Sequence, residues 1–300
     1  MLDDTLAVEE DLYLLEQQIR YTYASPVRRL RHRLMVVPRA VHGSQYRFDH
    51  GLTVSGGPVQ VKVTSDSFDN HVVEVRAAAV TECLEFDAWA LVACRGSDEF
   101  IEVPPGSVDR RHLLAPTPLT EANDMIIDTA RGLLAASSGD LDLAERICAW
   151  SHEALTYQYG VTGVRTDAAS ALAGGRGVCQ DYAHVMLALC RAAGLPARYV
   201  SGHLVGEGGS HAWVEVVVDD RLGTSGRTVA VAFDPTHNRR ATRGYFTVAI
   251  GRDYTHVAPT SGRFEGSCPG VLSTRKRLSR ANTHAADRLT TMGKRREAAL

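Results

Sequence analysis

The chain has 300 residues, which is long enough to bury a hydrophobic core and, at roughly 150 residues per domain, to form about two domains. Hydrophobic residues make up 44% and charged residues 23%, values typical of soluble globular proteins that exclude a disordered, collagenous or coiled-coil chain. Lysine and arginine total 33 against 35 aspartates and glutamates, so the net charge of −2 gives no electrostatic argument for nucleic-acid binding.

The sequence carries no signal for a membrane span or for export. No run of about 18 apolar residues occurs, and the N-terminal residues are acidic rather than basic and then apolar. The six cysteines lack the spacing of a zinc site and are spread thinly over the chain. We therefore expect a cytoplasmic protein with reduced thiols, no metal, no other cofactor, and neither a membrane nor a nucleic acid as partner.

Short β-like runs follow one another through the first third of the chain, broken by turn-forming glycines. They cover residues 21–23, 30–37, 59–64, 71–80 and 88–94. A segment rich in proline and glycine, 104–118, then marks a domain boundary. The sequence therefore predicts an all-β N-terminal domain over residues 1–108.

Helices and then strands are predicted in the second part of the chain. Helical patterns cover 118–136, 140–155 and 179–193, and the last ends at Gly194 with Pro196 just beyond. Strand-like runs follow at 197–205, 211–218, 228–233 and 245–250. This order predicts an α+β domain over residues 109–262, with helices packed on an antiparallel sheet.

A C-terminal strand and a basic tail are assigned to residues 263–300. Eight lysines and arginines lie in 275–300 against Asp287 and Glu297, which gives this segment a net charge of +6. We interpret it as a solvated terminus that is dispensable for chemistry. The alternative is that it docks on the acidic remainder and completes a cleft or recruits an acidic partner.

Cys179 stands at the start of the strongest helical pattern, directly after a glycine-rich turn. The helix dipole and the unpaired N–H groups of the first turn favour a thiolate there, and the same N–H groups can stabilise an oxyanion. An isolated cysteine at this place would be interpreted as a small buried hydrophobic residue. The residues that accompany it make Cys179 a candidate nucleophile.

Two later strands offer a base and a carboxylate. If 211–218 and 227–234 form a symmetric hairpin, Val218 pairs with Arg227 and His211 faces Asp234. The two-residue period places His211 and Asp234 on the face that also carries Trp213, Glu215, Ala230 and Ala232. We expect the Cys179 helix to pack on the alanines, so that His211 takes the thiol proton and Asp234 holds the imidazole in the required tautomer.

Four blocks of sequence occur in order: GVCQDYAH at 177–184, AGLPARYVSG at 193–202, SHAWVEV at 210–216 and FDPT at 233–236. Together they resemble the bacterial transglutaminase-like superfamily. GRDYTHVAPT at 251–260 extends the similarity, and YTYASPV at 21–27 with SFDN at 67–70 resembles the β-rich domain that often precedes this core.

The resemblance implies a papain-like α+β core in which Cys179 is the nucleophile, His211 its base and Asp234 the orienting carboxylate. A tryptophan that commonly stands before the Asp-Pro block is replaced here by Val229, Ala230 and Val231.

Further side chains are weighed around this triad. Tyr157 and Gln158, with the adjacent Tyr159, lie upstream of the nucleophile, where related cores often place an oxyanion-stabilising side chain, and Trp213 is expected to exclude water. Asp181 is interpreted as a complement to the helix dipole. The remaining candidates, which lack metal-ligand spacing, are interpreted as satisfied or solvent-facing histidines: His184, His203, His237 and His256.

These observations predict a cysteine-dependent enzyme that attacks an amide, peptide or isopeptide carbonyl of a peptide or protein substrate and forms a thioester at Cys179. Hydrolysis is favoured over transfer to an amine, because the sequence shows no second site for an amine. A transamidase and a catalytically silent peptide-binding module are the alternatives. The substrate and the oligomeric state stay open.

Overall fold

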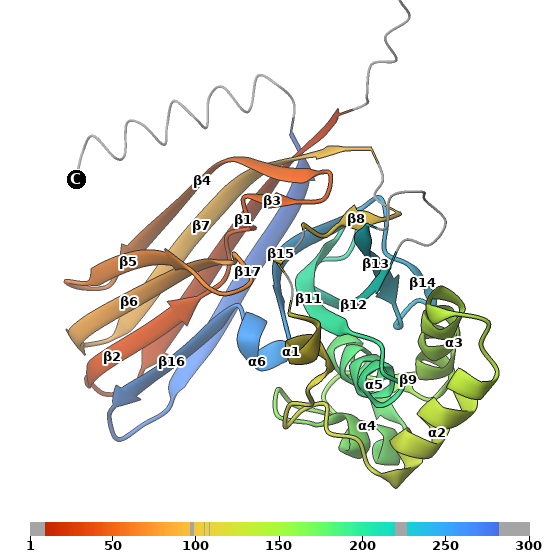
Figure 1. Ribbon diagram of the computed structural model, residues 1–300. Coiled ribbons are helices and arrows are strands. Elements are labelled where there is room, and N and C mark those ends of the chain that lie inside the picture. Colours follow the sequence, from red (N-terminus) through yellow and green to blue (C-terminus); the bar gives the residue numbers. More distant parts are fainter. Residues whose placement is uncertain (1–9, 97–98, 105, 108, 220–226, 282–300) are drawn as a thin grey trace, which may run out of the picture.

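The computed structural model describes residues 10–96, 99–104, 106–107, 109–219 and 227–281. A β-sandwich lies beside a second domain in which helices cover one face of a sheet (Figure 1). The predicted α+β class with an all-β N-terminal domain is confirmed. Among the described residues, no helix has the length and apolar character needed to cross a bilayer.

The sandwich consists of two antiparallel sheets. The first has the order β17-β1-β7-β4-β3 and contains β1 (Glu10–Tyr23), β3 (Val41–His42), β4 (Gln45–Ser55), β7 (Cys83–Arg95) and β17 (Gly270–Arg280). The second has the order β16-β2-β6-β5 and contains β2 (Val27–Leu34), β5 (Gln60–Ser65), β6 (His71–Val80) and β16 (Thr260–Glu265). Alternate side chains of both sheets, among them Ile19, Leu30, Val75 and Phe86, form the core between them.

The last two strands return to the N-terminal sandwich, which changes the predicted domain division. β16 pairs with β2 and β17 pairs with β1, so residues 260–280 belong to the sandwich rather than to a separate C-terminal segment. The interpretation of 275–280 as solvated tail is therefore wrong, because these residues form strand β17 and Arg280 pairs with Asp11. Residues 282–300 of the predicted tail lie outside the described residues.

The second domain combines helices with an antiparallel sheet. Its helices are α1 (Arg110–Leu114), α2 (Asp124–Ala135), α3 (Asp140–Glu153), α4 (Ala168–Gly174), α5 (Cys179–Ala192) and α6 (Tyr254–Val257). Its sheet has the order β14-β13-β12-β11-β15, with β11 (Ala197–Leu204), β12 (His211–Asp219), β13 (Thr228–Asp234), β14 (Arg239–Arg240) and β15 (Tyr245–Gly251). β8 (Ile101–Glu102) pairs with β13, and β9 (Thr156–Tyr157) pairs with β10 (Arg176–Gly177).

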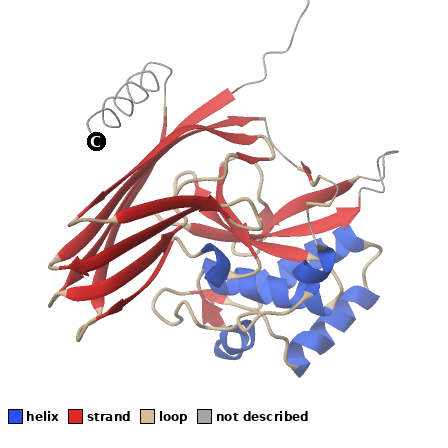
Figure 2. Ribbon diagram, turned by 60° about the vertical axis from the view of Figure 1, so that its left-hand side comes forward, coloured by secondary structure: helices blue, strands red, loops and turns tan. Residues whose placement is uncertain are grey.

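The central sheet is covered on both faces, which explains why nearly every residue of β11, β12 and β13 is buried. Figure 2 shows most of the helices gathered on one side of it, while Leu113 of α1 packs on the other face beside Val217 and Ala230. α5 packs on the valine face, where Val214, Val216 and Phe233 share its core. We expected α5 on the alanine face. That face is instead covered by the N-terminal domain. Its Phe68 packs against the cluster that contains Ala232 and against the cluster that contains Ala230.

The pairing of β12 with β13 differs from the predicted register by two residues. Val218 lies opposite Val229 rather than Arg227, and Val214 lies opposite Phe233. Because side chains alternate with a period of two, a two-residue shift leaves every side chain on its predicted face. His211 and Asp234 therefore remain on one face as diagonal rather than direct neighbours, and residues 220–226 of the predicted turn lie outside the described residues.

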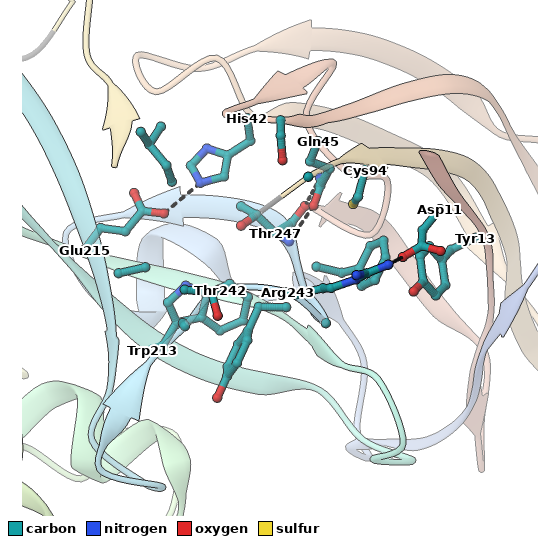
Figure 3. Close-up of a pocket in the computed structure, with 18 residues that line it drawn as sticks. Asp11, Tyr13, His42, Gln45, Cys94, Trp213, Glu215, Thr242, Arg243 and Thr247 are labelled. Carbon is teal, nitrogen blue, oxygen red and sulfur yellow. Dashed lines mark hydrogen bonds and ion pairs between the residues drawn. The ribbon is translucent and has the colours of Figure 1, made fainter. Parts of the chain in front are cut away.

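A buried hydrogen bond joins the two domains. Glu215 of β12 is fully buried, and its carboxylate accepts from His42 Nε2 of β3 at 2.7 Å and from Arg198 Nε of β11 at 2.7 Å. Figure 3 shows His42 and Glu215 pointing toward each other across the joint, beside a cavity of about 50 Å³. Burial alone would raise the pKa of Glu215, but His42 and Arg198 hold it well below its ordinary range.

The role of β17 predicts the effect of shortening the chain. A chain that ends after Ser273 loses residues 274–280, which pair with residues 13–19 of β1. We expect its free energy of unfolding to fall by roughly 3 kcal/mol or more, since each strand hydrogen bond contributes about 1 kcal/mol net. A chain that ends after Ala281 keeps the strand and is the matched control. Urea denaturation measures both, and equal midpoints would contradict the place of 274–280 in the sandwich.

Candidate active site

The sequence before α5 fixes where this helix begins. Gly175 ends α4 with a φ of 62°, the left-handed region that favours glycine. A Cβ at Gly177 would lie 2.6 Å from the Asp181 side chain, so this position must also be glycine. The Asp181 carboxylate accepts from the Val178 N–H at 2.7 Å and from Thr162 Oγ1 at 2.7 Å. Asp181 therefore caps the helix start, and Cys179 becomes its first residue.

Cys179 meets His211 at the edge of the domain. Cys179 is the first residue of α5 and His211 the first residue of β12, and their side chains lie near enough for Cys179 to raise the pKa of His211. His211 is 4% exposed and Cys179 is partly exposed, so the thiol is the more accessible partner. The backbone N–H groups that open α5 have no intrahelical acceptor, because the first turn of any helix lacks one.

Asp234 holds the opposite nitrogen of the imidazole. Its Oδ2 lies 2.7 Å from His211 Nε2, which leaves Nδ1 for the thiol. The carboxylate is completely buried, and its Oδ1 accepts from the Thr236 N–H at 2.9 Å in the turn that follows the Asp-Pro pair. The structure thus brings the three residues of the predicted triad together in the order Cys179, His211 and Asp234.

The charges of this cluster support one another. Burial alone would lower the pKa of His211, but the hydrogen bonds to Asp234 and Cys179 outweigh it and raise the pKa to about 10. Burial alone would raise the pKa of Asp234, but the bonds from His211, Tyr245 and His237 hold it well below its ordinary range. The arrangement therefore favours an imidazolium beside a carboxylate.

Three further residues complete the cluster, and the sequence did not single out their roles. Tyr245 Oη donates to Asp234 Oδ2 at 2.6 Å, and His237 Nδ1 lies 2.7 Å from the same oxygen. Glu207 lies 3.3 Å from His237 Nε2 and 3.7 Å from His211 Nδ1. His237 stands three residues after Asp234 in the Asp-Pro turn, and this spacing is the one local signal that could have indicated its contact.

The predicted oxyanion residues lie in different surroundings. Tyr157 is 43% exposed, and it lies near enough to Cys179 to interact with it electrostatically. Gln158 donates its backbone N–H to Gly177 O at 2.9 Å, and its side chain accepts from Arg176 at 3.4 Å. Trp213 is 1% exposed and stacks on His211 with the ring centroids 6.2 Å apart, so it supports the imidazole from the interior and also lines the cavity between the domains.

Of the four histidines set aside from the sequence, His237 alone joins the triad. His184 is buried in α5 and accepts from the Tyr254 N–H, His203 bonds with Gly209 O, and His256 bonds with Asp253. The potential metal-ligand atoms of His211, Asp234 and His237 lie within 4.8 Å of one another. Both imidazoles hydrogen-bond to Asp234 Oδ2, so the same atoms form a hydrogen-bonded network centred on this carboxylate.

Two segments of the chain match known protein families. Residues 127–222 match the Transglutaminase-like superfamily, and residues 13–93 match the Bacterial transglutaminase-like N-terminal region. This chain belongs to the transglutaminase-like superfamily. The matched core segment contains Cys179 and His211, and the chain supplies Asp234 twelve residues beyond it.

Relatives of this transglutaminase-like chain are known from sequence and from structure. An uncharacterized protein of Mycobacterium leprae is 36% identical over 164 residues, which cover 51% of this chain and 55% of that protein. One of Mycobacterium tuberculosis is 36% identical over 132 residues, or 40% of each chain. The chain thus spans about half the length of the curated relatives it matches, or less. A candidate cysteine protease from Cytophaga hutchinsonii has the same fold, with a TM-score of 0.72 over 92% of both chains at 21% identity.

The hydrogen bond from His211 to Asp234 predicts the behaviour of Asp234→Asn. The amide favours the wrong tautomer of the imidazole, so we expect kcat to fall by about a thousandfold or more with little change in KM. The pKa of His211 should also fall from about 10 toward the ordinary value of 6.5, because the carboxylate charge is gone. NMR titration of the imidazole measures this shift, and a variant imidazole that still titrates near 10 would contradict the assignment.

The bond from Tyr245 to Asp234 predicts a smaller effect for Tyr245→Phe. Loss of one donor to a buried carboxylate weakens its hold on His211, and we expect kcat to fall about tenfold. Tyr21→Phe is the matched control, because it removes a hydroxyl that bonds with Thr260 in the sandwich. Steady-state kinetics of the two variants separate the roles, and an equal loss in both would assign Tyr245 to stability alone.

Proposed function

We propose that this protein is a cysteine-dependent acyl-transfer enzyme that cleaves an amide, peptide or isopeptide bond through a thioester at Cys179. The observation that carries the proposal is the hydrogen bond between His211 and Asp234 beside Cys179, with the thiol partly exposed and the carboxylate buried. A nucleophile next to a base that a third group orients is the general form of an activated nucleophile.

In the proposed reaction the thiol proton resides on His211, and the thiolate sulfur of Cys179 attacks the carbonyl carbon. The carbonyl oxygen becomes an oxyanion, which the first N–H groups of α5 stabilise with the positive end of the helix dipole. The C–N bond then breaks, and His211 returns the proton to the leaving amine. Water attacks the thioester in the second half, loses its proton to His211, and releases the acid and the free thiol.

The buried hydrogen bond between His211 and Asp234 supports catalysis rather than simple peptide binding. A peptide-binding module has no need of an imidazole whose second nitrogen is held by a buried carboxylate, whereas proton transfer requires this arrangement. Transfer to an amine remains the alternative outcome for the same thioester. We favour hydrolysis, because water is always present and an amine needs a binding site of its own.

We further propose that the enzyme works in a reducing compartment such as the cytoplasm. Cys148 and Cys190 are buried free thiols, and burial raises the pKa of each to about 12, which makes both thiols inert. The proposed substrate is a peptide or protein amide.

The proposal predicts that Cys179→Ala abolishes turnover. The change removes the nucleophile but little packing, so we expect the free energy of unfolding to stay within about 1 kcal/mol of the parent protein. Intact-mass detection of an acyl-enzyme, with a library of glutamine- and amide-containing peptides, provides the direct measurement.

Cys83→Ala is the control, because Cys83 is a partly exposed thiol of the sandwich. Labelling with a small thiol electrophile at several pH values distinguishes an enzyme from a binding module. Turnover by Cys179→Ala, or labelling of Cys179 no faster than that of Cys83, would contradict the proposal.

A further inference from the structure

The loop between β11 and β12 brings a second carboxylate to the base. Glu207 has a side chain that is 43% exposed, with one oxygen 3.7 Å from His211 Nδ1 and the other 3.3 Å from His237 Nε2. Asp234 takes the other nitrogen of each imidazole. Glu207 therefore lies on the side of His211 that faces Cys179, opposite the buried carboxylate.

Exposed tyrosine rings border the same space. Tyr157 is 43% and Tyr159 78% exposed, and their rings meet edge to face at 5.5 Å. Burial and the bond with Tyr159 raise the pKa of Tyr157, and the charges of Cys179 and Glu207 raise it further. A carboxylate beside tyrosine faces is the chemistry by which proteins hold organic cations.

The charge of Glu207 is only partly balanced within the protein. Across the described residues, the ion pairs of Glu207 are those with His211 and His237, and neither a lysine nor an arginine takes part. A half-exposed carboxylate of this kind remains available to a cation that arrives with a substrate.

Glu207 lies beside the place where the leaving group of the substrate must bind. His211 gives a proton to the leaving amine, so the leaving group must lie next to Nδ1 while the bond breaks. Glu207 is 3.7 Å from that nitrogen, so its carboxylate borders the leaving-group side of the cleft.

We propose that Glu207 selects substrates in which the residue that follows the scissile bond has a cationic side chain, lysine or arginine. This inference rests on the proposed function and names the substrate class of the same site. Glu207 binds the ammonium or guanidinium group, Tyr157 and Tyr159 flank it, and the scissile nitrogen is held beside His211. Glu207 is thus a specificity-determining residue.

Acyl transfer to amino-acid amides tests the proposal, because an acceptor occupies the leaving-group side during the reverse step. p-Nitrophenyl acetate acetylates Cys179 and releases p-nitrophenol. The α-amine of the acceptor then attacks the thioester, its proton passes to His211, the C–S bond breaks, and an acetylated amide leaves. Argininamide and its neutral isostere citrullinamide differ only in the charge to be recognised.

We expect the parent protein to give a ratio of acetylated amide to acetate about fivefold higher with argininamide than with citrullinamide at low ionic strength. The preference should shrink in high salt, where charges are screened. In Glu207→Gln the two acceptors should become equivalent. Glu82→Gln, which removes the same charge from the exposed turn between β6 and β7, should keep the preference of the parent protein.

The outcomes separate this inference from the function on which it rests. Release of p-nitrophenol that does not depend on Cys179 would overturn the proposed function and the inference together. Cys179-dependent release with equal use of both acceptors by the parent protein would overturn the role of Glu207 alone. A preference for argininamide that persists in Glu207→Gln would do the same.

Discussion

A buried carboxylate links the two domains. Glu215 is fully buried in the central sheet, and an unpaired carboxylate in such a place costs several kcal/mol. Arg198 of the adjacent strand satisfies one oxygen, and His42 of the N-terminal domain satisfies the other. The sheet can therefore bury this face only with the sandwich in place, and the first and last parts of the chain become part of the architecture of the candidate site.

Strand β12 connects the buried Glu215 to the base His211. His211, Trp213 and Glu215 alternate along β12 and share the face that the sandwich covers. Trp213 is held between the domains, stacks on His211 and meets Tyr245 edge to face at 5.3 Å. Tyr245 in turn donates to Asp234. The imidazole is thus supported by an aromatic wall whose far side is the domain interface, and the wall keeps water from the side of the imidazole that faces Asp234.

Local patterns predicted the fold well, and contacts between distant segments limited the rest. The three long helices, the start of α5 at Cys179 and the faces of β12 and β13 follow from residues close together in sequence. The error of two residues in the hairpin was harmless only because it was even. The pairing of β1 with β17 has no local signal, and the choice of face for α5 depended on a domain interface that sequence patterns do not describe. Glu207 was missed for the same reason, since its neighbours are set by the fold.

The charges of the site also contribute to stability in a defined pH range. The pKa of Asp234 is lowered in the folded protein, so its contribution is present above the ordinary value of 3.8 and is lost as the pH falls below it. The pKa of His211 is raised to about 10, so its contribution is complete below the ordinary value of 6.5 and is lost as the pH rises toward 10. The two groups make their full contributions to stability only between pH 3.8 and pH 6.5. Both contributions weaken outside this range, because each group is the partner of the other. Near neutral pH the fold still holds the imidazolium, and a charged acid beside the sulfur is the state that protonates a leaving amine.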